Sequence, residues 1–255
     1  MIDTHCHLDL AVFDEDRAAV MERSRQAGVV QWVVPALSLA HFPALVALRT
    51  PELHVALGLH PLFIHDHPDD GIGQLAQWVA RIQPVALGEI GLDATAPNQE
   101  RQQKLFAAQL DLAREARLPV LLHVRKCHEP VLALLQRTAF SCGGIVHAFN
   151  GSVQQAHRYL AMGFRLGMGG VVTHEAAVRI RQMAREVPEE ALVLESDAPD
   201  LPPVGHRGER NEPCHLPLVV QALAALRQVS QARIVETTTH NARATLGLAD
   251  LRRAE

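Results

Sequence analysis

The sequence predicts an α/β fold, a (β/α)8 or TIM barrel formed by one domain over residues 1–255. Eight apolar runs of strand length recur along the chain, and segments with helical periodicity lie between them. Apolar strands that alternate with amphipathic helices indicate a parallel sheet covered on its outer side. The chain's 255 residues also match the roughly 250 that such a barrel needs. An open, doubly wound sheet is the alternative, but it would spread the polar strand ends along a crevice.

The expected strands follow one another from the first residues to the last third of the chain. Each is a short apolar run, as is typical of strands buried in a parallel sheet. They lie at Ile2–His7, Val30–Leu37, His54–His60, Val85–Leu92, Val120–Arg125, Ile145–Phe149, Phe164–Gly169 and Ala191–Asp197.

The expected helices occupy the intervals and the carboxyl-terminal part. In the clearest one, Asn98–Arg117, alanines and leucines recur at three- and four-residue spacing. Glycine, a common residue after a helix end, directly follows two others. The remaining expected helices lie at Asp14–Ala27, Ser152–Met162, Leu216–Val229 and Ile234–Leu246. The segment Pro199–Pro213 is too long for a simple turn, and we expect it to form a loop at the functional rim.

Composition excludes several classes of protein. A net charge of −4 with 7 Phe, 2 Trp and 1 Tyr argues against a protein that coats nucleic acid. The 4 cysteines show no C-x-x-C spacing and no disulfide framework. No run of 18 apolar residues could span a membrane, and the first residues predict a strand instead of a signal peptide. We therefore expect a cytoplasmic enzyme without a membrane partner. The sequence leaves its oligomeric state open and is compatible with a monomer.

Six polar residues end the apolar runs in a pattern that predicts a metal site. Four are histidines and two are carboxylates, a suitable ligand set for two divalent cations: His5, His7, Glu89, His123, His147 and Asp197. Because the carboxyl ends of parallel strands meet at one rim of a barrel, we expect these side chains to converge there. Strand alternation places His5 and His7 on one face, whereas Cys6 should point outward against the helices.

Seven short motifs identify the family that the chain resembles. They occur in order from residue 3 to residue 213 and read DTHCHLD (3–9), GLHP (58–61), GEIGLD (88–93), HVR (123–125), HAFNGS (147–152), ESDAP (195–199) and RNEP (210–213). In this order they resemble the TatD family of metal-dependent deoxyribonucleases, within the amidohydrolase-like metallohydrolases. Ser196 stands where the family commonly has Thr, and Val124 is a second small departure. Neither removes a ligand.

The resemblance implies a division of the ligands. His5, His7 and Asp197 would hold one cation, His123 and His147 the other, and Glu89 would bridge the two. Asp197 and Glu89 would also be the catalytic residues, with Asp197 orienting or deprotonating the nucleophile. Related barrels often use a carboxylated lysine on the fourth strand as the bridge, but the fourth expected strand, Val85–Leu92, has no lysine. Imidazole ligands favour Zn, Mn, Co or Ni as the bound metals, with Mg possible during activity.

Four further residues are expected to contact substrate: His60, Arg125, Arg210 and Asn211. Arg125 is suited to clamp a phosphate, and an ion pair with Asp93 or Glu89 is the alternative. The expected function is hydrolysis of phosphodiester bonds by a 3'-5' type deoxyribonuclease that binds single-stranded DNA ends, or another phosphate ester, transiently. One alternative is a hydrolase of small amides, lactones or non-nucleotide esters on the same metal site. A non-catalytic barrel is a second alternative, but the ligand set is complete.

Overall fold

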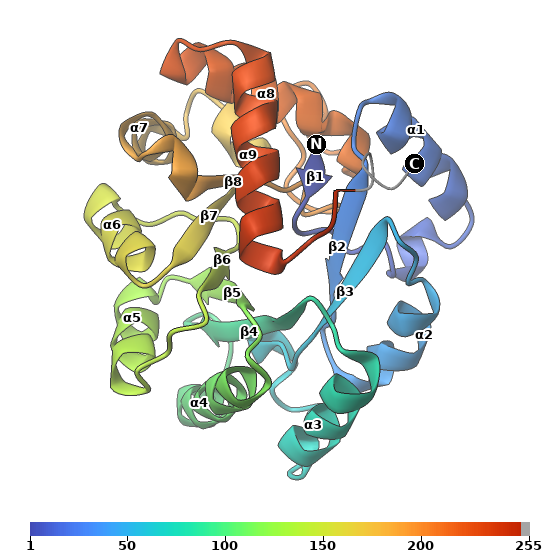
Figure 1. The fold of residues 1–255 in the computed structure, drawn as a ribbon, viewed down its shortest axis with the longest axis vertical. Coiled ribbons are helices and arrows are strands. Elements are labelled where there is room, and N and C mark those ends of the chain that lie inside the picture. Colours follow the sequence, from blue (N-terminus) through green and yellow to red (C-terminus); the bar gives the residue numbers. More distant parts are fainter. Residues whose placement is uncertain (251–255) are drawn as a thin grey trace.

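The computed structural model describes residues 1–250, so the last five residues of the expected domain lie outside the described part. Eight parallel strands pair in chain order from β1 to β8 and form a single-domain barrel, seen along its axis in Figure 1. Their bounds are β1 Ile2–Asp3, β2 Gln31–Pro35, β3 Leu53–Leu57, β4 Ala86–Asp93, β5 Val120–Arg125, β6 Gly144–Val146, β7 Phe164–Met168 and β8 Leu192–Leu194. The predicted fold is confirmed.

The ring closes just beyond the ends of its first and last strands. The Thr4 N–H donates to the Leu194 carbonyl at 2.9 Å, and the Asp197 N–H donates to the His5 carbonyl at 2.9 Å. These two bonds satisfy backbone groups that would otherwise be unpaired at a sheet edge. They also fix the two ligand-bearing segments after β1 and β8 against each other.

The helices surround the barrel (Figure 1). They are α1 Arg17–Gln26, α2 Phe42–Ala47, α3 Gly71–Ile82, α4 Gln99–Ala116, α5 His128–Arg137, α6 Val153–Ala161, α7 Val178–Glu186, α8 Leu216–Arg227 and α9 Gln231–Leu246. Side chains cap several at their starts. Asn98 accepts from the Arg101 N–H before α4, and Ser152 forms a capping box with Gln155 before α6. Among residues 1–250, none of these helices has the length and apolar character needed to cross a bilayer.

Two apolar layers leave only one end of the barrel open. The larger layer lies between the strands and the helices, and it contains the fully buried Cys6, as predicted. A smaller one fills the barrel interior with Ile2, Val33, Leu121 and Ile145, and residues of α9 pack against it. Asn241 of α9 donates to the carbonyl of Leu192, the first residue of β8. Helix α9 therefore closes the amino-terminal end, and a site can open only at the carboxyl-terminal rim.

Candidate metal centre

All six predicted ligands converge at the carboxyl-terminal rim. Glu89 and His123 lie within β4 and β5, and His147 directly follows β6. The strands β1, β6 and β8 end earlier than predicted, and the backbone after β1 and β8 makes the bonds that close the ring. His5, His7 and Asp197 therefore lie on irregular backbone just past β1 and β8.

The first group of donor atoms surrounds the Nε2 atom of His5. This atom lies 3.3 Å from His7 Nε2, 3.2 Å from Glu89 Oε2 and 3.9 Å from Asp197 Oδ1. His7 Nε2 is 3.7 Å from the same Asp197 oxygen. Donor atoms of His5, His7 and Asp197 all lie within 4.8 Å of one another, as one shared cation requires. These three residues are the set expected for the first metal.

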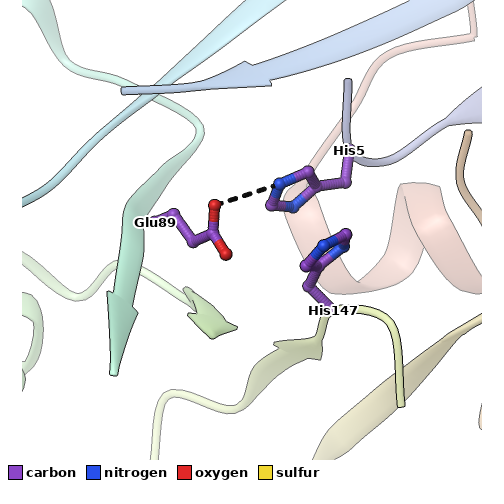
Figure 2. A group of neighbouring side chains, drawn as sticks. All are labelled: His5, Glu89 and His147. Carbon is purple, nitrogen blue, oxygen red and sulfur yellow. Dashed lines mark ion pairs between the residues drawn. The ribbon is translucent and has the colours of Figure 1, made fainter. Parts of the chain in front are cut away.

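The second group forms around the other oxygen of Glu89. Glu89 Oε1 lies 3.0 Å from His123 Nδ1 and 3.3 Å from His60 Nε2. His60 was expected to contact substrate, but its ring nitrogen lies within ligand range of the same site. His147 stacks on His5 at 3.5 Å between ring centroids and groups with His5 and Glu89, as Figure 2 shows. No group of donor atoms found within residues 1–250 joins His147 to His123, so their expected pairing on the second cation remains a prediction.

Glu89 reaches the barrel interior because β4 is irregular. Leu87, Ile90 and Leu92 all pack in the outer apolar layer, although a regular strand alternates its faces. The pairing of β4 with β5 shifts between Leu87 and Ile90, and this shift turns Glu89 inward. Gly88 permits it, since a Cβ atom there would lie 2.7 Å from Leu121 Cβ.

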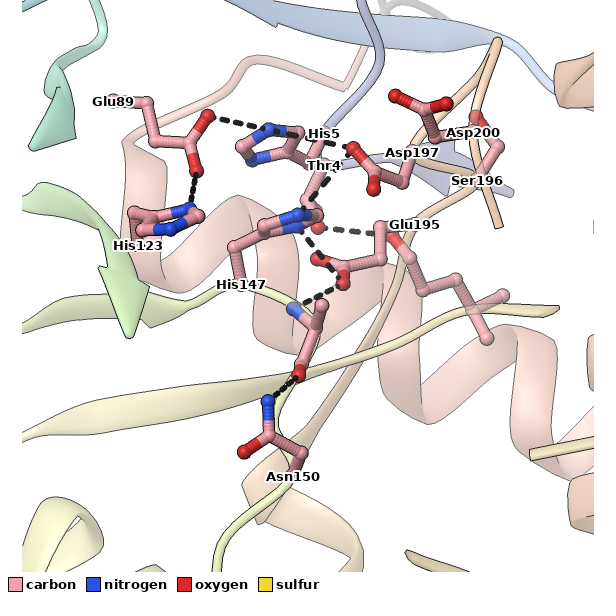
Figure 3. A network of polar contacts seen from close by, with 12 residues as sticks. Thr4, His5, Glu89, His123, His147, Asn150, Glu195, Ser196, Asp197 and Asp200 are labelled. Atoms are coloured by element: carbon pink, nitrogen blue, oxygen red, sulfur yellow. Dashed lines mark hydrogen bonds and ion pairs between the residues drawn. The ribbon is translucent and has the colours of Figure 1, made fainter. Parts of the chain in front are cut away.

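Two carboxylates behind the ligands orient the histidine rings. Asp93 Oδ2 lies 3.0 Å from His123 Nε2, so the opposite nitrogen of His123 faces Glu89. Glu195 Oε1 lies 3.1 Å from His147 Nδ1 and accepts the Ala148 N–H at 2.6 Å (Figure 3). Such partners fix the ring tautomer and raise the basicity of the ligand nitrogen. Sequence reasoning missed both roles, although strand alternation does put Glu195 on the face of Asp197.

A third buried carboxylate holds the segment that carries Asp197. Asp3 accepts hydrogen bonds from the Ser196 hydroxyl at 2.6 Å and from the Ser196 N–H at 2.9 Å. Burial raises the pKa of Asp3 to about 7, and the Ser196 bonds oppose that rise. Serine keeps the hydroxyl that a threonine would supply here, so this departure from the family motif preserves the contact.

Charge in the centre favours cation binding. Burial, together with neighbouring His147, lowers the pKa of His5, which leaves its lone pair free to bind a metal. Burial opposes ionisation of Glu89, but the imidazoles of His60 and His5 outweigh it and hold the pKa of Glu89 well below its usual range. Burial lowers the pKa of His123, yet Asp93 and Glu89 outweigh it and raise that pKa to about 9. The carboxylates thus attract positive charge where a cation would bind.

The donor atoms open into a cavity of about 670 Å³. Arg125 lines this cavity and is exposed, and its side chain makes no hydrogen bond or ion pair to any residue in 1–250. Apolar residues, among them Leu37, Leu62 and Phe63, form the wall around His60. The size suits one small molecule or one segment of a chain.

Two residues that were expected to contact substrate form hydrogen bonds within the protein instead. Arg210 donates to Asp16 at 2.7 Å and to Glu212 at 2.9 Å, and its guanidinium lies over the Phe13 ring. Asn211 is 1% exposed and donates to the carbonyls of Ser196 and Asp200. Neither lines the cavity. Their hydrogen-bonding groups instead anchor the 199–213 loop.

Comparisons with known proteins place this geometry in a family. The model of the TatD related DNase family matches residues 2–247. The metal-dependent hydrolase YjjV of Escherichia coli K12 is 39% identical over 94% of this chain and 95% of its own. The 3'-5' ssDNA/RNA exonuclease TatD of Erwinia billingiae is 34% identical over 89% of this chain and 91% of its own. The crystal structure of YjjV superimposes with a TM-score of 0.93 at 38% identity, covering 98% of each chain.

Proposed function

This chain belongs to the TatD family of metal-dependent hydrolases, and from that premise we propose that it cleaves phosphodiester bonds at the ends of single-stranded DNA. The observation that carries the proposal is one cavity that combines a buried imidazole and carboxylate centre with an exposed Arg125, which has no side-chain partner within residues 1–250. A guanidinium without a carboxylate partner suits a phosphate oxygen. The 3'-5' direction is taken from the name of the Erwinia billingiae relative.

The proposal assigns two divalent cations to this donor set. His5, His7 and Asp197 would hold one, His123 and His147 the other, with Glu89 between them. Such ions, when bound, polarise a phosphoryl oxygen and lower the pKa of water. His60 is an additional donor within reach of Glu89. Four imidazoles favour transition metals over Mg.

Asp197 would orient the attacking water. Burial opposes its ionisation, but His147 and His5 outweigh this and lower the pKa of Asp197, so the group is a carboxylate at neutral pH. Its Oδ1 atom lies 3.3 Å from His147 Nε2, and the residue lines the cavity. A carboxylate held in this way accepts a hydrogen bond from a water molecule. This bond directs a lone pair of the water oxygen toward a bound phosphate.

Arg125 would hold the phosphate from the side of β5. It lies on the same strand face as His123, one layer nearer the rim. Since the donor atoms lie at the base of a cavity within the barrel rim, a strand end or flexible single strand reaches them more easily than the middle of a duplex. The proposal therefore favours stepwise release of mononucleotides.

The proposal is tested with metal-replete protein and a set of substrates. We expect up to two transition-metal ions per chain and release of mononucleotides from single-stranded DNA, with slow cleavage of closed duplex. Oligonucleotides labelled at the 3' or the 5' end establish the direction. Asp197→Asn should remove turnover, and Asp111→Asn, on the exposed face of α4, is the control. Turnover of an amide or lactone with no cleavage of any phosphodiester would establish the alternative hydrolase instead.

A further inference from the structure

A second, smaller cavity of about 190 Å³ adjoins the metal cavity. The two share four lining residues, Ala148, Asn150, Asp197 and Leu201. Because Asp197 belongs to both, a molecule held over the metal donors can extend directly into the second cavity. We call this second space the side cavity.

The side cavity is mainly apolar and deepens into the core. Its apolar lining comes from the β6–α6 loop, β7, η4 (Gly170–Thr173), α7 and the 199–213 loop, namely Phe149, Met168, Val171, Val172, Ile180 and Leu201. Phe149, Met168 and Val172 are each 1% exposed and form its base, whereas Leu201 is 37% exposed at the mouth. Glu195 and Asp197 line the side that faces the metal donors, whereas these apolar side chains cannot hold a cation or a phosphate. The apolar lining requires an apolar part of the substrate.

We propose that the side cavity binds one six-membered aromatic ring, the pyrimidine base of the terminal nucleotide. This inference rests on the proposed nuclease function. An apolar cavity of about 150 Å³ is enough for a benzene ring. The observed volume of about 190 Å³ therefore accepts a single ring and leaves little space for the fused rings of a purine.

The position of the side cavity also explains why the bound nucleotide would be terminal. Its base is closed by buried residues, so the chain cannot continue through it. The larger cavity extends to the exposed Arg125 and to Leu62, which is 46% exposed, and neither of them lines the side cavity. The strand would therefore enter through the larger cavity and place its last base in the side cavity.

The amide of Asn150, at the junction of the two cavities, is already held by the protein. Asn150 Nδ2 donates to the Ala148 carbonyl at 3.2 Å, and its Oδ1 lies 3.1 Å from His128 Nε2. These two contacts fix the position of the Asn150 amide at the junction between the cavities. Affinity for the base should come from the burial of its ring and not from rearrangement of Asn150.

The test fills the side cavity and measures recognition of the ring. Val171→Phe, on the half-buried wall, adds an aromatic ring to the cavity, and Ile180→Phe repeats the change from α7. Val178→Phe is the matched control, because Val178 is 68% exposed and lines neither cavity. Circular dichroism, thermal midpoints and metal analysis check that each variant folds and carries its metals.

Binding is measured by calorimetry on metal-loaded protein with thymidine 5'-monophosphate, deoxyadenosine 5'-monophosphate and deoxyribose 5-phosphate. The wild type should bind the thymine nucleotide roughly tenfold or more tightly than the sugar phosphate, because a ring is buried. The adenine nucleotide should exceed the sugar phosphate in affinity by a smaller factor. Val171→Phe and Ile180→Phe should remove the preference for thymine, and Val178→Phe should keep it.

Cleavage of oligonucleotides that end in thymine, adenine or an abasic residue separates this inference from the proposed function. Cleavage that does not depend on the terminal base would overturn the side-cavity assignment without affecting the proposed nuclease function. A thymine preference that persists in both Val171→Phe and Ile180→Phe would do the same. Thymine binding that depends on Val171 without any DNA cleavage would support the cavity and reject the nuclease. Equal affinity for all three monophosphates would overturn the assignment.

Discussion

Replacing Asp93 with Asn should weaken metal binding at His123 while leaving the barrel folded. Asp93 Oδ1 accepts two hydrogen bonds from Thr95, at 2.7 Å from its N–H and 2.6 Å from its hydroxyl. The other oxygen, Oδ2, lies 3.0 Å from His123 Nε2. An asparagine has one oxygen and one NH2 group, so it can accept hydrogen bonds from Thr95 or from His123 but not from both.

The magnitude follows from the burial of this contact. The Asp93 side chain is 0% exposed, so water cannot replace the lost acceptor. A hydrogen bond to a charged group contributes about 1.5–3 kcal/mol. Loss of the acceptor behind a histidine ligand typically lowers metal affinity about 10–100-fold, which corresponds to about 1.4–2.7 kcal/mol. We expect a change in this range for one of the two cations.

Competition with a chelator of known affinity measures the effect directly. Wild type, Asp93→Asn and Asp111→Asn are compared, since Asp111 pairs with Arg114 on the surface at 2.7 Å. One metal should leave Asp93→Asn at lower chelator concentration, with a modest change in thermal midpoint. If Asp93→Asn holds both metals as tightly as the wild type and the surface control, the assigned role of Asp93 in orienting His123 is wrong.

The remaining predictions concern the charged residues of the site and the direction in which strand side chains point. Glu89→Gln should lower activity by about 10³-fold or more with a modest change in thermal midpoint, whereas Cys6→Ser should leave kcat nearly intact; the reverse result in steady-state kinetics would mean that the strand facing is wrong. Because His123 stays protonated below its pKa of about 9, bound metal displaces a proton, so affinity should rise with pH up to about that value. Calorimetry in buffers of different ionisation enthalpy would show this release, and a pH-independent affinity would contradict it. Arg125→Ala should raise KM on DNA without removing metals, and the salt dependence of KM should correspond to about one to three ion contacts, whereas steep salt inhibition would exclude so narrow a site.

Much of the fold and of the ligand set could be predicted because both depend on local patterns. Apolar runs and helical periodicity are readable over short windows, and they indicate every strand of the described barrel. Alternation also places two ligands correctly. Leu121 and Ile145 fill the barrel interior, and His123 and His147, two residues further along, reach its rim on the same face.

Contacts between distant segments could not be predicted in the same way. Arg210 belongs to the RNEP motif, but its guanidinium donates a hydrogen bond to Asp16, 194 positions away in the sequence. Asp93 is equally suited by residue type to pair with Arg125, its neighbour in the β4–β5 pairing, yet it contacts His123 instead. Choosing between such partners requires distances, because the residue types suit each role equally well.

Glu89 shows where strand alternation alone would have failed. Leu87 faces the helices, so a regular strand would also point Glu89 outward, away from every other ligand. The register shift between Leu87 and Ile90 adds one residue to the strand and reverses the facing of the residues beyond it. Glycine inside a strand indicates a bulge or a close backbone approach, and Gly88 lies at this point of the GEIG motif. The motif therefore encodes the irregularity that turns its own carboxylate toward the histidines, and regular β-structure at this position would separate Glu89 from them.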